Sequence, residues 1–84
     1  MKHELKCEPG PFLALLEGRK RVELRFDDRG FAEGDTLLLR EIVGEGRYYT
    51  GRHVEVSVLH VLHGGQYGLQ PGWVAMSIEL KETA

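Results

Sequence analysis

Alternation of apolar and polar residues marks most of the strands that this chain is expected to form. The clearest case is residues 53–62, where Val54, Val56 and Val58 alternate with His53 and Glu55. A two-residue period of this kind is typical of a strand with one buried face. Comparable patterns predict further strands at residues 2–7, 21–27, 36–43 and 73–80.

One short helix is expected after the first strand, in the segment "EPGPFLALLEG" (residues 8–18). Pro11 suits a first helical turn, and Phe12, Leu15 and Leu16 have the three- and four-residue spacing of a helical stripe. Gly18 is placed to end the helix. About two turns of helix are not stable alone in water, so we expect the apolar stripe to pack on the sheet.

Glycine-rich segments separate the later strands and predict loops at residues 27–35, 44–52 and 63–72. Five or so strands with one early helix predict an α+β domain. A sheet in so small a protein leaves two exposed edges unless it curls. We therefore expect a small barrel plugged by the helix, with the three loops gathered around one mouth.

Length and composition narrow the class of protein. The 84 residues, 42% of them hydrophobic, suit one folded domain over residues 1–84. No apolar run reaches the length of a membrane span, and the first ten residues lack the apolar stretch of a signal peptide. The single Cys7 suits a reducing compartment and is expected to act as a small apolar residue. These features predict a cytoplasmic protein without a membrane partner.

Positive charge is concentrated in one part of the chain although the net charge is only −2. Eight of the eleven Lys and Arg residues lie between residues 19 and 52, and the segment "GRKRVELRFDDR" (residues 18–29) holds five of them. In this segment Val22, Leu24 and Phe26 alternate like residues of a buried face. The charged residues between them then share the opposite face, which we expect to point into a cleft.

Four residues of this segment, Gly18, Lys20, Glu23 and Arg25, fit the pattern G-x-K-x-x-E-x-R. The pattern resembles the signature of the ASCH superfamily, whose members have PUA-like barrels. A helix before the signature and a "GDTLLLRE" strand after it extend the likeness to nearly the whole chain. In particular, the chain resembles short bacterial and phage ASCH-like proteins grouped as a domain of unknown function, with starts like "KHELK" and ends like "YGLQPGWVAMSI". The resemblance implies a PUA-like barrel of about five to six strands, one N-terminal helix and a cleft lined by the signature.

The resemblance also implies classes of function. Members of the superfamily bind RNA, nucleotides or modified nucleosides, one branch resembles an amidohydrolase acting on acetylated cytidine, and another has ribonuclease activity. The amidohydrolase branch has a Thr nucleophile directly after the signature Lys, whereas this chain has Arg21 there. Because an arginine cannot act as that nucleophile, the mechanism does not carry over.

The residue types of the signature suit ligand binding on chemical grounds. Glu23 and Arg25 lie two residues apart on one strand face, where the carboxylate can orient the guanidinium and leave donors for a phosphate or a base edge. Lys20 is expected at the junction before the strand, because a buried unpaired ammonium would be very costly. The plainer alternatives are a solvated Lys20 and a structural Glu23–Arg25 ion pair.

Other residues give weaker signals. His60 and His63 are three apart and face opposite sides of a strand, so no metal site is expected. His63 and Tyr67 are placed to border the cleft, whereas His60 shares parity with the buried valines and is expected in the core. Trp73 is also expected in the core. Tyr48 and Tyr49, with Tyr67 and Trp73, are candidate surfaces for stacking a base.

The sequence therefore predicts a binding module for RNA, a nucleotide or a modified nucleoside, without cofactor or metal. The expected ligand-binding residues are Lys20, Glu23, Arg25, Arg29 and Tyr67. A first alternative is a small hydrolase with Lys20 as base and Glu23 as proton carrier. A second alternative is a protein-interaction module. The sequence alone does not separate these three.

Overall fold

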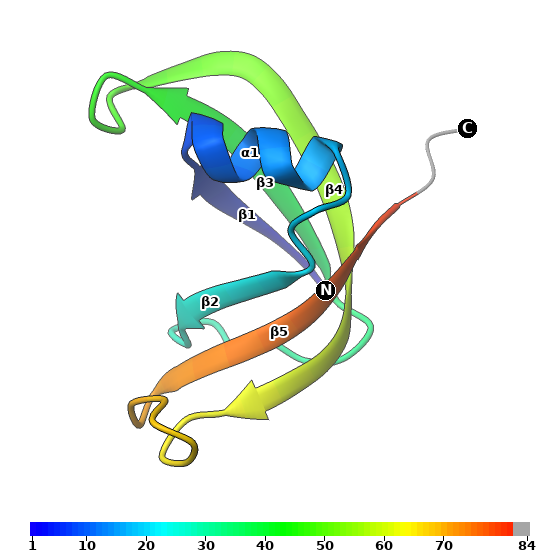
Figure 1. Ribbon diagram of the computed structural model, residues 1–84, viewed down its shortest axis with the longest axis vertical. Helices are drawn as coiled ribbons and strands as arrows, with labels where there is room; N and C mark the ends of the chain where they lie inside the picture. Colours follow the sequence, from blue (N-terminus) through cyan, green and yellow to red (C-terminus); the bar gives the residue numbers. More distant parts are fainter. Residues whose placement is uncertain (82–84) are drawn as a thin grey trace.

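Five strands and one short helix make up the fold of the part of the chain that the structure describes. The computed structural model describes residues 1–81, and in chain order the elements are β1 (Lys2–Cys7), α1 (Pro9–Leu16), β2 (Val22–Phe26), β3 (Thr36–Val43), β4 (Tyr48–His63) and β5 (Trp73–Leu80) (Figure 1). The predicted strand-rich α+β class with one early helix is confirmed. In the described part of the chain, no helix has the length and apolar character needed to cross a bilayer.

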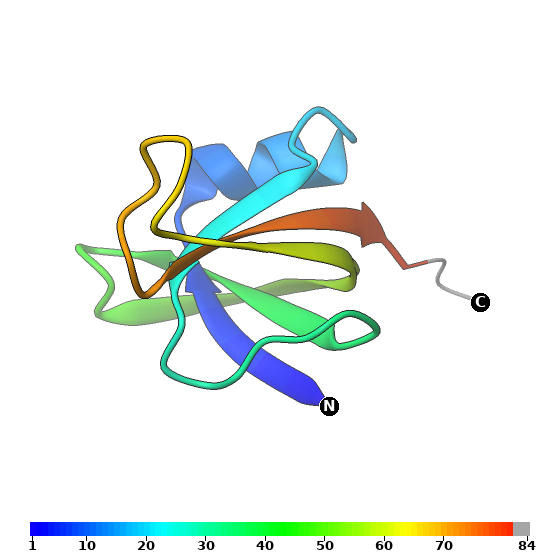
Figure 2. The ribbon, with the colours of Figure 1, turned by 90° about the horizontal axis from the view of Figure 1, so that it is seen from below.

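All five strands belong to one sheet in the order β1-β3-β4-β5-β2, so β1 and β2 are its two edges. Strand β1 pairs with β3 in parallel, and the other neighbours pair in antiparallel fashion. The 16-residue strand β4 pairs with β3 along its first half and with β5 along its second half. Because β4 bends strongly between these halves, the sheet curls into a half-barrel (Figures 1 and 2).

Helix α1 packs its apolar stripe on the inner face of the sheet. Phe12 and Leu15 are each 1% exposed and join the core residues Leu5, Cys7, Phe31, Leu37, Leu39, Val56, Val58, Val74, Met76 and Ile78. Full burial of such side chains contributes about 1.5–3 kcal/mol each, which offsets the instability of so short a helix. Gly18, with φ of +75°, donates its N–H to the Leu15 carbonyl and ends the helix as predicted. The predicted packing of Leu16 on the sheet was wrong, because this residue is 42% exposed.

Two loop predictions were wrong. Residues 48–52 are the first part of β4, because Tyr48 and Tyr49 pair with Val43 and Ile42 across the hairpin. The turn is therefore confined to residues 44–47. This turn and the loop at residues 64–72 lie at the two ends of β4, at the top and bottom of Figure 1, so they do not gather around one mouth.

The burial predicted for β2 was also wrong, because its two faces are reversed. Val22, Leu24 and Phe26 are 47%, 55% and 56% exposed, whereas Glu23 is only 6% exposed. The pairing with β5 gives the reason, since Glu23 lies opposite Met76, whose side chain faces the core. Residues directly opposite each other in an antiparallel pair share a face, so the charged residues of β2 point inward.

A bulge in β4 reverses the expected orientation of His60. The register against β5 shifts between Val58 and His60, so the extra residue Leu59 changes the parity of the strand. The His60 side chain is consequently 64% exposed, and its Nδ1 lies 2.8 Å from Glu33 Oε1. Trp73 is also not a core residue, because it is 37% exposed on the outer face.

Candidate functional site

A buried carboxylate held by two cations is the centre of the candidate site. Glu23 Oε1 accepts a hydrogen bond from Lys20 Nζ at 2.6 Å, and Glu23 Oε2 accepts from Arg25 Nη2 at 3.0 Å and from Arg25 Nε at 3.3 Å. The side chain of Glu23 is 8% exposed, against 22% for Lys20 and 29% for Arg25. The predicted Glu23–Arg25 pair is therefore present, and Lys20 joins it.

The turn between α1 and β2 brings Lys20 to this position. The backbone N–H groups of Arg19 and Lys20 both donate to the Ala14 carbonyl, which folds the chain back over the last helical turn. Lys20 then stands just before β2, as predicted from the cost of burying an unpaired ammonium. Its Nζ also donates to the Val22 carbonyl at 2.6 Å, which fixes the ammonium beside the strand.

Arginine side chains bridge the seam between the edge strands β1 and β2. Arg25 Nη2 donates to the Lys6 carbonyl at 2.7 Å, and Arg29 Nη1 donates to the Glu4 carbonyl at 2.7 Å. Both acceptors are main-chain oxygens of β1, which pairs on its other side with β3. The half-barrel is thus linked across its open side by side chains instead of a backbone ladder.

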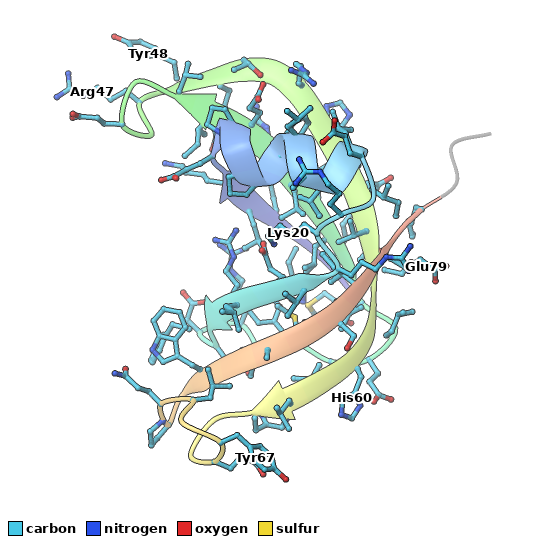
Figure 3. All side chains as sticks on the ribbon, in the orientation of Figure 1. Lys20, Arg47, Tyr48, His60, Tyr67 and Glu79 are labelled. Carbon is cyan, nitrogen blue, oxygen red and sulfur yellow. The ribbon has the colours of Figure 1, made fainter. Side chains whose placement is uncertain are left out.

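A cavity of about 380 Å³ lies at this seam, close to the N-terminal end of α1. Figure 3 places Lys20 near the middle of the molecule, between α1 and β2. The residues that line the cavity are Lys6, Cys7, Glu8, Pro11, Lys20, Glu23, Leu24, Arg25 and Ile42. The structure therefore brings three of the predicted ligand-binding residues, Lys20, Glu23 and Arg25, to one cavity.

The cations at the cavity keep hydrogen-bond donors unused. Of the five N–H groups of Arg25, those on Nε and Nη2 are engaged, and within residues 1–81 both N–H groups on Nη1 have no partner. Lys20 uses two of its three N–H groups. The two positive charges of Lys20 and Arg25 exceed the single negative charge of Glu23, so the cluster of these three side chains carries one net positive charge. This arrangement can hold an anion or a hydrogen-bond acceptor.

Cys7 lines the same cavity as a buried, neutral thiol. The residue is 5% exposed, and its Sγ donates to the Glu8 carbonyl at 3.6 Å. Burial raises the pKa of the thiol, and the negative charge of Glu23 raises it further. Since the thiolate is the reactive form, Cys7 is not activated as a nucleophile here. Its predicted role as a small buried residue is confirmed.

Two of the predicted ligand-binding residues lie away from the cavity. Arg29 bridges to β1 through the Glu4 carbonyl instead of lining the cavity. Tyr67 is 88% exposed, has a φ of +53°, and lies in the loop after β4, at the opposite end of the molecule from Tyr48 (Figure 3). The structure therefore does not bring Tyr67 together with Lys20.

Sequence reasoning missed several buried polar residues. Glu41 is 6% exposed and accepts a hydrogen bond from Thr50 Oγ1 at 2.9 Å. His3 and Asp35 are also buried, with His3 Nε2 at 2.8 Å from Asp35 Oδ2. The shared parity of Glu41 with Leu37 in β3 was a usable signal for burial. Within residues 1–81, no group of three or more His, Cys, Asp or Glu side chains is arranged to hold a metal ion.

The cavity residues that the sequence did not single out come from β1, α1, the junction between these two elements, and β3. Lys6, Glu8, Pro11 and Ile42 carry no local signal for a site, because they meet β2 only through the curl of the sheet. The main-chain carbonyl of Lys6 is nevertheless the acceptor that anchors Arg25.

Comparison with known proteins agrees with the likeness to a phage and bacterial domain. The chain is 46% identical over 59 residues to the "Uncharacterized 12.9 kDa protein in GpA 3'region" of Escherichia phage P2. This alignment covers 70% of the chain and 52% of the phage protein, so the chain spans about half the length of that relative. Residues 2–78 match the profile of a domain of unknown function, DUF3850, and the chain belongs to this family.

Proposed function

We propose that the protein binds RNA, a nucleotide or a modified nucleoside in the seam cavity. The observation that carries this proposal is the set of unused N–H groups on Arg25 and Lys20, which border a cavity of about 380 Å³ beside a carboxylate whose two oxygens are already paired. A phosphate or a base edge supplies the acceptors that these donors lack.

The size and lining of the cavity support a ligand of nucleotide size. Small-molecule pockets generally measure about 300–1,000 Å³, and this cavity lies at the lower end of that range. Pro11 and Ile42 add apolar surface next to the cations. A nucleotide or nucleoside has both a polar and an apolar part, whereas an inorganic anion uses only the cations.

Glu23 acts as a positioning residue in this proposal. Because its two oxygens accept from Lys20 and Arg25, it holds both cations in fixed rotamers before a ligand arrives. Such preorganisation lowers the conformational entropy lost on binding.

The geometry supports binding more than hydrolysis. In the alternative with Lys20 as base, the amine must accept a proton from the substrate, yet Lys20 Nζ is already engaged as a donor to Glu23 Oε1 and to the Val22 carbonyl, both at 2.6 Å. The buried thiol of Cys7 is not an activated nucleophile either.

The same cluster supports a finer assignment of the fold. We propose that the half-barrel is a PUA-like barrel of the ASCH type, since Gly18 ends α1 and the side chains of Lys20, Glu23 and Arg25 meet beside that helix. Three of the four signature residues, Lys20, Glu23 and Arg25, line a single cavity, and this supports the assignment.

Titration at low salt against labelled single-stranded RNA and a panel of nucleotides and nucleosides tests the proposal. We expect at least one ligand to bind, with a loss of about tenfold or more for Arg25→Gln, since one charge-assisted contact is removed. Arg47→Gln is the matched control, because Arg47 is an exposed cation in the turn between β3 and β4, away from Lys20 (Figure 3).

Few phosphate contacts are available at the cavity, so the affinity should fall only moderately with salt. The slope of log K against log salt is expected near −1 to −2, roughly one or two released counterions. Failure of every ligand to bind at tens of micromolar protein, or an equal loss in Arg25→Gln and Arg47→Gln, would count against the cavity as the binding site.

A further inference from the structure

A second cavity lies next to the seam cavity and shares part of its wall. It measures about 250 Å³, and its wall includes Glu8, Pro9, Ile42, Val43 and residues 44–46 of the turn between β3 and β4. This turn lies beside the N-terminal end of α1, at the upper left of Figure 1. Glu8 and Ile42 line both cavities, so the two cavities adjoin at these residues.

Glu8 presents a carboxylate without a partner at the border of the two cavities. The residue is exposed and occupies the N-cap position of α1, yet its side chain makes no capping hydrogen bond. Within residues 1–81 only its main-chain oxygen is engaged, as the acceptor for the Phe12 N–H at 2.9 Å and for Cys7 Sγ at 3.6 Å. An ionised carboxylate accepts hydrogen bonds and cannot donate them. Glu8 therefore favours a ligand that brings donors to this border.

The two cavities together offer three kinds of surface. Lys20 and Arg25 present unused N–H groups in the seam cavity. Ile42 adds apolar surface to both cavities, and Val43 adds more to the second one. Glu8 presents only acceptors. A complementary ligand has an anionic group, an apolar body and hydrogen-bond donors away from the anionic group, and a nucleotide whose base carries an amino group has all three.

The charges also set the direction in which such a ligand lies. A phosphate next to Glu8 would bring like charges together, whereas a phosphate at Lys20 and Arg25 meets the net positive charge of their cluster with Glu23. The phosphate therefore belongs in the seam cavity. The base then extends into the second cavity, with its edge against Glu8.

The four bases differ in what they offer to a carboxylate. The Watson–Crick edge of guanine has two adjacent donors, the N1–H and the N2 amino group, which match the two oxygens of a carboxylate. Adenine and cytosine offer one amino group next to an acceptor nitrogen. Uracil has a single N3–H between two carbonyl oxygens, which a carboxylate repels. Guanine is therefore the base that Glu8 favours most, and uracil is the one that it favours least.

We propose that Glu8 is a specificity-determining residue for guanine nucleotides, with the phosphate held at Lys20 and Arg25 and the guanine base in the second cavity. This inference rests on the proposed binding of a nucleotide in the seam cavity, and it adds the identity of the base. The two oxygens of Glu8 accept from the N1–H and the N2 amino group of guanine, while Ile42 packs against the apolar body of the nucleoside.

Isothermal titration calorimetry with GMP, IMP and UMP at low salt tests this assignment. The three nucleotides share the ribose and the phosphate, so differences in affinity report on the base. GMP should bind at least about fivefold more tightly than UMP, which is the lower end of the discrimination that one bidentate contact provides. IMP keeps the N1–H but lacks the N2 amino group, so its affinity should lie between the other two. Glu8→Gln should bring the affinity for GMP to within about twofold of that for UMP, because an amide has only one acceptor oxygen.

Two other variants separate the base from the phosphate. Glu17→Gln is the matched control, because Glu17 is an exposed carboxylate beyond the other end of α1 and lines neither cavity. It should leave the order of the three affinities unchanged. Arg25→Gln should weaken GMP and UMP by the same factor, since it acts on the phosphate that they share. Because Glu8 is exposed, thermal melts should find Glu8→Gln folded.

Equal affinities of the wild-type chain for GMP and UMP, or a preference for guanine that survives in Glu8→Gln, overturn the assignment of Glu8 but leave nucleotide binding intact. A wild-type chain that binds none of the three nucleotides overturns the assignment as well. Titration with single-stranded RNA then decides the proposed function separately.

Discussion

Replacing Glu23 by alanine should destabilise the fold far more than removing an exposed carboxylate. Glu23 is 8% exposed, and its two oxygens are paired with Lys20 and Arg25, which are themselves only 22% and 29% exposed. In Glu23→Ala, two partly buried cations remain without their counter-charge. When one partner of a buried ion pair is removed, the desolvation cost of the remaining charge is no longer compensated by the ion pair.

The size of this destabilisation follows from the two contacts of Glu23, with Lys20 and with Arg25. A hydrogen bond to a charged group contributes about 1.5–3 kcal/mol, and breaking a buried ion pair costs about 3–5 kcal/mol. Since Lys20 and Arg25 retain some contact with water, we expect a loss of about 2–4 kcal/mol in the free energy of unfolding. A domain of this size loses roughly 4–8 °C in Tm for each kcal/mol, so the Tm should fall by about 8–32 °C.

Thermal unfolding followed by circular dichroism measures this loss. Glu4→Ala is the control, because Glu4 also pairs with an arginine, Arg40, at 2.9 Å but is 56% exposed. An exposed pair contributes about 0–1 kcal/mol, so the Tm of this variant should change by only a few degrees. Equal Tm values for Glu23→Ala and Glu4→Ala would refute the reasoning, because the cluster would then have no structural role.

Three further outcomes are expected. The hydrogen bond from His3 lowers the pKa of Asp35 to about 2 from its ordinary 3.8. The ionised Asp35 therefore stabilises the folded state fully above about pH 4, and this stabilisation is lost as the pH falls toward 2. Asp35→Asn should flatten the curve of Tm against pH in this window, and an unchanged curve would contradict the role of the carboxylate. Gly64→Ala should lower the Tm strongly, because an added Cβ would lie 1.9 Å from the Gln70 carbonyl oxygen. A variant that melts at the same temperature as the wild-type chain would disprove this close approach. Cys7 should resist alkylation in the folded protein and react after denaturation, as mass spectrometry can show; rapid labelling of the native chain would mean that the thiol is accessible.

The sequence predicted the elements well because each has a local cause. The alternation in residues 73–80 is the whole of β5, and Pro11 with Gly18 frames α1. These signals depend on backbone preferences and on the period of the apolar residues, both of which act within a few positions. The number of strands, their order in the chain and the early helix therefore followed from the sequence.

The side of the sheet on which residues lie did not follow from the alternation alone. A two-residue period says which residues share a face but not which face is buried. In β2, the pairing of Glu23 with Met76 across the ladder decides the matter. In β4, the single extra residue Leu59 reverses the parity of His60, and no residue type in "SVLHVL" marks that bulge.

The candidate site was predictable only in part for the same reason. Lys20, Glu23 and Arg25 lie within six residues of one another, so their spacing alone suggested contact. The rest of the cavity depends on long-range arrangement, since Lys6 comes from the other edge of the sheet. Tyr67, in contrast, was placed at the cleft from an assumed gathering of loops that the bent strand β4 prevents.

The reversed strand and the open seam have one physical cause. With β1 and β2 as unpaired edges, main-chain carbonyls of β1 at Glu4 and Lys6 need donors that no neighbouring strand supplies. Arg25 can reach Lys6 only if it points to the inner side of β2, and Glu23, two residues earlier, must then point inward as well. The inward carboxylate requires its two cations, which creates the charged cavity, and the apolar residues of β2 are left outside. The exposure of the apolar side chains of β2 and the charge of the seam cavity therefore have the same origin, and a change that closed the seam with backbone pairing would remove the need for the inward-facing charges.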